Sequence, residues 1–294
     1  MHWSFVTLRL LAVHAHPDDE SSKGAATYAY YRSRGARVMV VSCTGGDSGS
    51  ILNENLAARA HAERDITGLR HLEMSRAREA MDIEHRWLGF TDSGLPEDGE
   101  TIRPDSFAAL PLEFSGPPLV KVIREFRPQV LVTYDENGGY PHPDHIRAHE
   151  VAIWAKDAAA DPTRYPELGQ PWAVQKLYYD RIFSAERFGA VYDLLVERDP
   201  ESPLVARLTE MKEWMGRERG PKPTTFVPAG DFFEVRDEAL RAHASQVAPD
   251  SDFFFWPNDI QRAAWPTEDF QLIESSVPTD LPETDLFAGI EDNE

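Results

Sequence analysis

The sequence predicts an α/β protein with a Rossmann-like, mostly parallel sheet flanked by helices, and three observations support this fold class. Short apolar, β-rich runs alternate with segments of helical period through the first half of the chain. Strands and helices in alternation require right-handed crossovers between parallel strands. Two dense polar clusters directly follow two of the expected strands, and open α/β sheets bind their ligands at that edge.

The first quarter of the chain contains two strands and two helices in alternation. The apolar run at 8–13 predicts a strand, and the segment at 22–34 predicts a helix that Gly35 ends. The nearly continuous apolar run at 37–44 is typical of a strand buried on both faces. The segment at 59–81 predicts a helix, with apolar positions that include Leu69, Leu72, Ala77 and Ala80.

The alternation continues to the middle of the chain. A short strand is expected at 86–90, and a helix at 119–126 carries basic residues near its end, where they suit the helix dipole. The run QVLVTY at 129–134 predicts another buried strand, and 148–160 predicts the helix that follows it.

Beyond residue 176 the pattern loosens. One more strand is expected at 176–183, and helices are expected at 204–219 and 233–247. The cluster Asp252–Trp256 is aromatic, and the tail is rich in proline and acid. We expect a core at 1–183 and a C-terminal lobe at 184–294 that caps the sheet and completes the same domain.

Composition excludes several classes of protein. Of 294 residues, 41% are hydrophobic and 11% aromatic, which is enough for a core and excludes a disordered chain. The 30 basic and 50 acidic residues give a net charge of −20. Such a surface repels nucleic acid and anionic membranes, so we expect neither as a partner. A small-molecule partner fits, and a homo-oligomer is left open.

The expected cellular location and the expected type of metal ligand follow from two features that are absent: long apolar runs and pairs of cysteines. No apolar run approaches the ~18 residues of a membrane-spanning helix, and the start does not read as a secretory signal. The single cysteine, Cys43, is expected in the core and excludes an intramolecular disulfide or a cysteine-rich metal cluster. We therefore expect a cytoplasmic protein in which any metal is held by histidines and carboxylates.

The first polar cluster contains a possible pair of metal ligands. His16 and Asp19 lie three residues apart across the turn from strand to helix, so their side chains can converge on one point. Imidazole nitrogen and carboxylate oxygen suit zinc or another divalent transition metal. Asp18 can face the same cavity without being a ligand. The alternative is that Asp18, Asp19 and Glu20 only favour the helix N-terminus.

The second cluster, His142-Pro143-Asp144-His145, follows the strand at 129–134. A third ligand from it would complete a set of two histidines and one carboxylate, with a coordination position open for water, as in catalytic sites. The alternative is a pair of ordinary surface histidines in a proline-rich turn. Two clusters of the same chemistry at one sheet edge favour the metal site.

These residues resemble a known family. The pair HPDD and HPDH resembles the LmbE/PIG-L zinc-dependent N-deacetylases, which act on N-acyl glucosamine compounds. Across essentially the whole chain, further segments resemble the amidase branch of that family, whose substrates are S-conjugates of mycothiol: AVHAHPDDESSKGA, TGGDSGSILN, WLGFTDSGLP, YDENGGYPHPDHIRAH, LRAHASQV and LPETDLFAGI.

The resemblance implies a role for individual residues of the site. It implies that zinc is held by His16, Asp19 and His145. Asp18 matches the general base that takes a proton from the attacking water, and His142 matches the group that supports the tetrahedral intermediate and protonates the leaving amine. Two further matches are Tyr140, a tyrosine proposed to help hold the oxyanion, and Asp144, the acid that orients His142.

Substrate recognition is also implied by the resemblance. Arg70 and Asp92 match positions that grip the glucosaminyl-inositol part, and their charges suit hydroxyls and an amine. Lys23 matches a lysine of the amidases that reaches the acylcysteine side, although by itself it reads as a solvated lysine. His14 is expected to be structural, and His243 is a candidate for lining the pocket.

The chemistry of amide hydrolysis agrees with these roles. A poor electrophile and a poor leaving group require an activated water, a polarised carbonyl and a proton for the departing nitrogen, and His142 as an imidazolium would supply that proton. We expect the amide of mycothiol S-conjugates to be cleaved into a mercapturic acid and glucosaminyl-inositol. Three alternatives are the deacetylation of N-acetylglucosaminyl-inositol, a secondary-metabolism relative with another conjugate, and a catalytically silent binding module.

Overall fold

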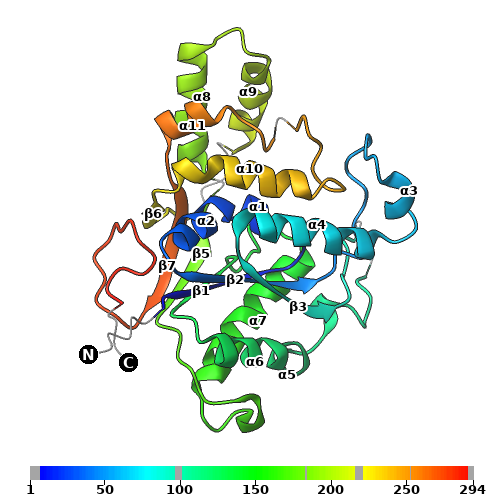
Figure 1. The fold of residues 1–294 in the computed structure, drawn as a ribbon, viewed down its shortest axis with the longest axis vertical. Helices are drawn as coiled ribbons and strands as arrows, with labels where there is room; N and C mark the ends of the chain where they lie inside the picture. The colour runs from blue at the N-terminus through cyan, green and yellow to red at the C-terminus, as the bar shows by residue number, and fades with distance from the viewer. Residues whose placement is uncertain (1–6, 97–100, 183, 216–220, 252, 291–294) are drawn as a thin grey trace.

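The computed structural model describes residues 7–96, 101–182, 184–215, 221–251 and 253–290. A seven-stranded mixed sheet lies between two layers of helices (Figure 1). The strands are β1 (Arg9–His14), β2 (Arg37–Thr44), β3 (Glu84–Phe90), β4 (Val130–Thr133), β5 (Lys176–Asp180), β6 (Thr225–Val227) and β7 (Glu268–Ser275).

The α-helices are α1 (Asp19–Ser22), α2 (Ala25–Ser33), α3 (Arg59–Ala62), α4 (Ile66–Met81), α5 (Leu112–Ser115), α6 (Pro117–Phe126), α7 (Pro143–Ala160), α8 (Ala185–Arg198), α9 (Pro203–Met215), α10 (Phe233–Ala242) and α11 (Asn258–Ala264). Three short 3-10 helices lie at Phe107–Ala109, Pro166–Leu168 and Gly230–Phe232.

The sheet confirms the predicted fold class. Its order is β3-β2-β1-β4-β5-β7-β6, and all pairs from β3 to β5 are parallel. Only β7 is antiparallel to its neighbours, β5 and β6. Because β1 pairs with β2 on one side and with β4 on the other, the direction of winding reverses between β1 and β4. Their carboxyl ends therefore form the ligand-binding switch point of the sheet.

The predicted strands agree with the structure, whereas two predicted helices are each divided. The helix expected at 22–34 is α1 and α2, separated by Gly24. Gly24 has φ +155°, and a Cβ there would lie 2.5 Å from Tyr28 Cζ, so only glycine fits. The helix expected at 59–81 is α3 and α4. Asp65 begins α4 by accepting a hydrogen bond of 2.8 Å from Gly68 N.

Other boundaries shift for local reasons. Helix α7 begins at Pro143, earlier than the expected 148, because proline suits the first helical position and His142 provides the cap. Helix α10 ends at Ala242, earlier than the expected 247. The expected ends at Phe183 and at residues 216–219 lie outside the described residues. Sequence patterns did not predict α8, α11, β6 or β7.

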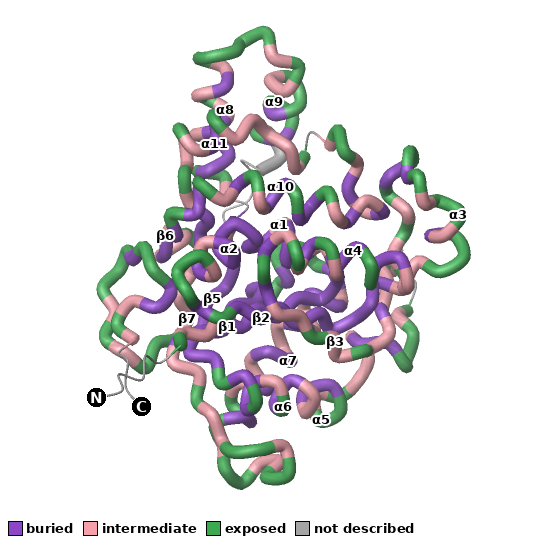
Figure 2. The backbone as a smooth tube through the Cα atoms, viewed as in Figure 1, coloured by how far each residue is buried: buried purple, intermediate pink, exposed green. Residues whose placement is uncertain are grey.

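Two apolar clusters, one on each face, hold the sheet. One joins it to α2, α4 and α10, and the other to α6 and α7. Figure 2 shows the buried strands between these layers. The C-terminal residues complete this sheet through β6 and β7, whereas α8, α9 and α11 form a third apolar cluster above it.

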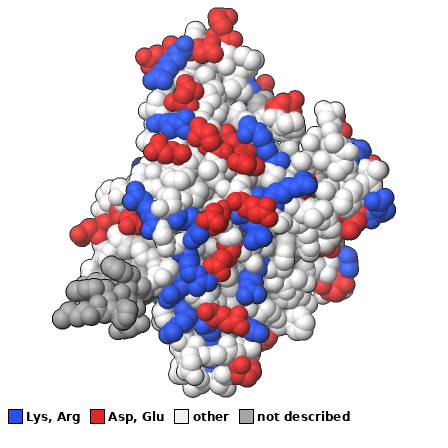
Figure 3. Space-filling model, in the orientation of Figure 1, with Lys and Arg blue, Asp and Glu red and all other residues white. Residues whose placement is uncertain are grey.

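Two features of the structure concern contacts with charged partners and with membranes: the surface charge and the length of the apolar helices. On the face in Figure 3, lysine and arginine side chains lie among aspartate and glutamate side chains. Among the described helices, none is both long and apolar enough to cross a membrane.

Candidate functional site

The two predicted polar clusters meet at the switch point between β1 and β4. His16, Asp18 and Asp19 follow β1, and Asp18 and Asp19 begin α1. His142 caps α7 and His145 lies in its first turn, after the loop that leaves β4. Residues about 125 positions apart in sequence thus face one another, because β1 and β4 are hydrogen-bonded neighbours.

Three predicted ligands converge on one point. Asp19 Oδ2 lies 3.4 Å from His16 Nδ1 and 3.4 Å from His145 Nε2. All three side chains are buried. His145 Nδ1 lies 2.9 Å from the carbonyl oxygen of Gly138, which fixes the ring, while its Nε2 makes no aligned hydrogen bond within the described part of the chain. A buried ring nitrogen left without a hydrogen is suited to a metal ion.

The ring of His16 is held from its other side. Its Nε2 lies 3.3 Å from Asp144 Oδ2 and 3.6 Å from Asp92 Oδ1. A hydrogen on Nε2 leaves Nδ1 free to bind metal, which is how carboxylates orient histidine ligands. Potential ligand atoms of His16, His142 and His145 also lie within 4.8 Å of one another, as do those of His16, Asp92 and Asp144.

The carboxylate of Asp144 lies beside His16, and its predicted role in orienting His142 stays a prediction. Its carboxylate accepts hydrogen bonds from Ser93 N at 2.8 Å and Ser93 Oγ at 2.5 Å, and it faces His16 rather than His142. The backbone N–H of Asp144 is the group that contacts His142. The cause is the start of α7, which turns the side chain of Asp144 toward β1 and the 91–94 segment.

His142 presents one ring nitrogen to the cavity. Its Nδ1 accepts a hydrogen bond of 3.1 Å from Asp144 N, so the neutral ring carries its hydrogen on Nε2. Burial, followed by the neighbouring His16 and His145, lowers the pKa of His142 to about 4. The imidazolium form expected from the sequence is therefore opposed by its surroundings.

Asp18 has the environment of a general base. Its side chain is about 26% exposed, and burial raises its pKa, whereas Arg70, with Nη2 3.7 Å from Asp18 Oδ2, lowers it. The backbone of Asp18 has φ 98°, a left-handed conformation that costs on the order of 1–3 kcal/mol for a residue other than glycine. Strain of this kind concentrates at functional sites.

Arg70 and Asp92 lie beside these groups and are almost fully buried. Arg70 donates from Nη2 to the carbonyl of Pro17 at 2.6 Å and from Nη1 to that of Gly46 at 3.1 Å. Asp92 accepts from Gly94 N at 2.8 Å and Ser48 N at 3.2 Å. Both residues thus brace the loops of the site, and their predicted contact with substrate stays a prediction.

Lys23 is buried, which differs from a solvated surface lysine. Its Nζ lies 2.5 Å from Asp19 Oδ1 and 5.5 Å from the centre of the Tyr134 ring. Burial lowers its pKa, but Asp19 and Asp180 outweigh burial and raise the pKa above its ordinary value. The lysine is therefore charged and partly neutralises a predicted metal ligand.

Tyr140 is the exposed member of the group. It is 49% exposed, and its ring centre lies 4.7 Å from that of His145 and 6.0 Å from that of His142. Burial raises the pKa of its hydroxyl, so it remains a hydrogen-bond donor at neutral pH. Its predicted contact with the oxyanion stays a prediction.

The sequence analysis missed a buried pair behind Asp18. Glu20 Oε2 accepts from Asp18 N at 3.0 Å, and Glu20 Oε1 lies 2.7 Å from His243 Nε2. Glu20 and His243 are both fully buried. The signal was present in HPDDE and LRAHASQV, but Glu20 was read only as an acid at a helix start. His243 reaches the site through Glu20, and His14 is structural, with Nε2 3.0 Å from Tyr28 Oη.

The fold and this cluster define a metal-binding α/β protein with its site at the switch point of the sheet. A family model described as PIG-L, GlcNAc-PI de-N-acetylase, matches residues 11–156. The chain is 50% identical over 291 residues to the mycothiol S-conjugate amidase of Streptomyces coelicolor, covering 97% of this chain and 98% of that protein. The chain belongs to the PIG-L family.

Two further comparisons concern a deacetylase relative and a solved structure. The chain is 38% identical over 291 residues to the 1D-myo-inositol 2-acetamido-2-deoxy-α-D-glucopyranoside deacetylase of Streptomyces avermitilis, covering 96% and 97% of the two chains. The N,N'-diacetylchitobiose deacetylase structure from Pyrococcus horikoshii is similar with a TM-score of 0.60 and 18% identity, covering 91% of this chain and 84% of that one. At that identity the similarity shows the fold alone.

Proposed function

We propose that this protein is a zinc-dependent amidase that hydrolyses the amide between glucosaminyl-inositol and N-acetylcysteine in mycothiol S-conjugates. The 50% identity to the amidase of Streptomyces coelicolor over almost the whole chain carries the proposal. Water adds to the amide and the C–N bond breaks, which yields a mercapturic acid and the amine of glucosaminyl-inositol. Deacetylases have the same fold, so the assignment of mycothiol S-conjugates as the substrate rests on the 50% sequence identity to the amidase.

The residues present fit a divalent metal. His16 Nδ1, His145 Nε2 and Asp19 Oδ2 would hold it, since each histidine nitrogen lies 3.4 Å from the carboxylate oxygen. Two histidines and one carboxylate are a ligand set that zinc accepts with a position left open. When bound, the metal would activate the attacking water and polarise the amide carbonyl.

The remaining steps belong to side chains of this chain. Asp18, with its raised pKa, takes the proton of the attacking water. His142 donates a hydrogen bond from Nε2 to the tetrahedral intermediate, and Tyr140 donates a hydrogen bond from its hydroxyl to the oxyanion. The proton held by Asp18 then passes to the departing nitrogen as the C–N bond breaks. Asp144 holds the ring of His16, so it acts as a positioning residue.

Recognition of the substrate divides between two sides of the site. Arg70 lies on α4, and Asp92 lies in the loop after β3; both contact the loops at the strand ends and take the glucosaminyl-inositol part. Lys23 lies at the end of α1, beside Asp19, and takes the acylcysteine part. A buried lysine that already neutralises Asp19 can also donate to a carbonyl oxygen of the substrate, because an ammonium group has three hydrogens.

A comparison of two substrates tests the proposal. We expect kcat/KM for a mycothiol bimane conjugate to exceed that for N-acetylglucosaminyl-inositol by at least about tenfold, or ~1.4 kcal/mol, because the acylcysteine part adds binding energy that the transition state can use. The zinc-loaded protein is assayed for both amine products. Equal rates or a reversed preference would move this chain to the deacetylase function, and no turnover of either would exclude both.

A further inference from the structure

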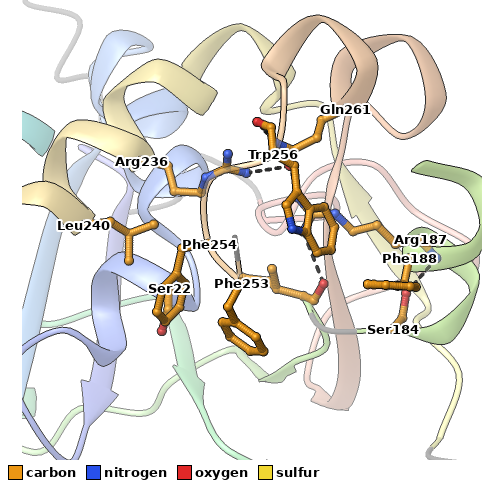
Figure 4. A pocket seen from close by; sticks show the side chains of 11 residues that line it. Ser22, Ser184, Arg187, Phe188, Arg236, Leu240, Phe253, Phe254, Trp256 and Gln261 are labelled. Carbon is orange, nitrogen blue, oxygen red and sulfur yellow. Dashed lines mark hydrogen bonds between the residues drawn. The ribbon is translucent and has the colours of Figure 1, made fainter. Parts of the chain in front are cut away.

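A pocket of about 470 Å³, including its open mouth, lies beside the proposed active site. Its lining residues come from α1, α8, α10, α11, the end of β5 and the 253–256 segment (Figure 4). Its lining residues are Ser22, Ile182, Ser184, Arg187, Phe188, Arg236, Leu240, Phe253, Phe254, Trp256 and Gln261.

The pocket shares a wall with the metal-binding cluster. Ser22 lies in α1, and its Oγ donates a hydrogen bond of 3.2 Å to the carbonyl oxygen of Asp19. Lys23, the next residue, contacts the Asp19 carboxylate. Ile182 follows the end of β5, next to β4, which leads to His142. The lining at Ser22 is therefore one residue from Lys23, whose side chain contacts the Asp19 carboxylate.

Most of the lining is aromatic or aliphatic. Phe188, Phe253, Phe254 and Trp256 supply ring surfaces, and the rings of Phe188 and Trp256 meet edge to face with centres 5.2 Å apart. Figure 4 shows Phe253 and Phe254 on one side of the pocket and Trp256 with Phe188 on the other. Such walls favour a flat apolar group, which can lie between the rings.

One polar group in the lining is incompletely paired. Arg187 is 5% exposed, and its Nε is buried without a hydrogen-bond partner within the described residues. Its Nη1 and Nη2 contact the Ile182 carbonyl at 3.1 Å and Gln261 Oε1 at 3.4 Å. Arg236 differs, because its guanidinium pairs with Asp237 at 2.7 Å. A ligand with an acceptor oxygen would therefore find a donor at Arg187.

From this geometry we propose that the pocket is the subsite for the S-substituent of the conjugate and that it prefers aromatic substituents, above all those that carry an acceptor oxygen. This inference rests on the proposed amidase function. The substituent undergoes no chemistry there, and its burial adds binding energy remote from the scissile amide, which can raise kcat as well as affinity.

The test compares two conjugates of mycothiol, S-benzyl and S-methyl, with the zinc-loaded protein. We expect kcat/KM to be at least about tenfold higher for the benzyl conjugate, and Phe254→Ala to reduce that ratio to about threefold or less. Phe114→Ala is the matched control, because Phe114 is 64% exposed on α5, on the opposite face of the sheet. Its ratio is expected to stay at that of the unmodified protein.

A binding measurement does not depend on turnover. The product N-acetylcysteine S-bimane should bind with a blue-shifted emission as the bimane enters the aromatic pocket, and Phe254→Ala should weaken that binding by about tenfold. Equal rates for both conjugates in the unmodified protein, or a ratio and emission unchanged in Phe254→Ala, would overturn the subsite while leaving the amidase function in place. Failure to hydrolyse either conjugate would overturn the amidase function, and with it the proposal that the pocket binds the S-substituent.

Discussion

The segments that follow β1, β3 and β4 bury charged side chains, whereas the lobe of α8, α9 and α11 buries mainly apolar side chains. The first region places six ionisable side chains out of solvent within one cluster: His16, Asp19, Lys23, Asp92, Asp144 and His145. The lobe is held by an apolar cluster of Phe188, Val191, Leu195, Leu208, Met211 and Ile260. Buried charges are tolerated only when they are paired, so the first region needs a rigid frame that the lobe does not.

This difference indicates that the charged cluster determines catalytic activity and that the lobe determines substrate selectivity. Parallel strands covered on both faces hold the charged cluster, and changes there should abolish chemistry. The lobe adds aromatic walls next to that cluster, and changes there should alter the choice of substrate. Contacts that join the C-terminal half to the catalytic region include His243 with Glu20, on α1, and Ser245 with Glu73, on α4.

The largest effect is expected from the loss of a metal ligand. His145→Ala should remove metal and lower turnover together, by more than about a thousandfold, because two ligands remain where zinc needs three. Metal content and kcat/KM are measured on the same preparation. His149→Ala is the matched control, one turn later on α7 with its Nδ1 3.0 Å from the Tyr134 carbonyl. Full metal and full rate in His145→Ala would show that the ligand assignment is wrong.

The second effect separates proton transfer from metal binding. Asp18→Asn should keep the metal and slow the reaction by roughly two to four powers of ten, the usual contribution of a positioned general base. The control is Asp82→Asn, since Asp82 also has a positive φ, of 54°, but lies exposed beside Arg32. Loss of metal from Asp18→Asn would instead make Asp18 a ligand.

The third effect concerns stability at the junction of the two regions. Burial raises the pKa of Asp180, at the end of β5, from 3.8 to about 7, with Lys23 and Arg181 opposing this rise. The folded state therefore binds a proton that the unfolded state has lost. Stability should fall as pH rises from about 4 to 7, by on the order of 4 kcal/mol, and Asp180→Asn should remove that fall.

Denaturant unfolding at several pH values between 4 and 8 measures the Asp180 effect. Asp193→Asn is the control, because its side chain is 71% exposed on α8. Parallel curves of unfolding free energy against pH for Asp180→Asn and the unmodified protein would mean that Asp180 is ionised in both states.

The smallest effect tests the contact that joins the two regions. His243→Ala should lower kcat about tenfold, or ~1.4 kcal/mol, with KM little changed, because Glu20 then holds the strained Asp18 backbone less firmly. His243→Gln keeps a donor for Glu20 and should recover much of the rate. Ser245→Ala, which removes the hydroxyl contacts with Glu73 and Gln246 and leaves the Glu20 contact in place, should reduce stability without this loss of kcat. Equal kcat in all three would make His243 purely structural.

Much of the fold and of the metal site could be read from residue patterns. The runs at 37–44 and 129–134 are buried on nearly every residue, so their apolar character alone predicted β2 and β4. The spacing after the first strand predicted His16 and Asp19 as ligands, and the family resemblance added His145. Strand β7 escaped prediction because its sequence, EDFQLIES, shows neither a continuous apolar run nor a regular alternation, and only pairing with β5 and β6 makes it a strand.

What the sequence by itself determined is the chemistry, and what only the tertiary structure decided is the direction of each side chain. The succession of strands along the chain and the types of ligand follow from local propensity and spacing. The Asp144 carboxylate, however, turns to His16 and Ser93, Lys23 turns to Asp19, and His243 arrives at Glu20 from 223 positions away. Those choices depend on which neighbours can pair a buried charge, and the neighbours exist only once the chain has folded.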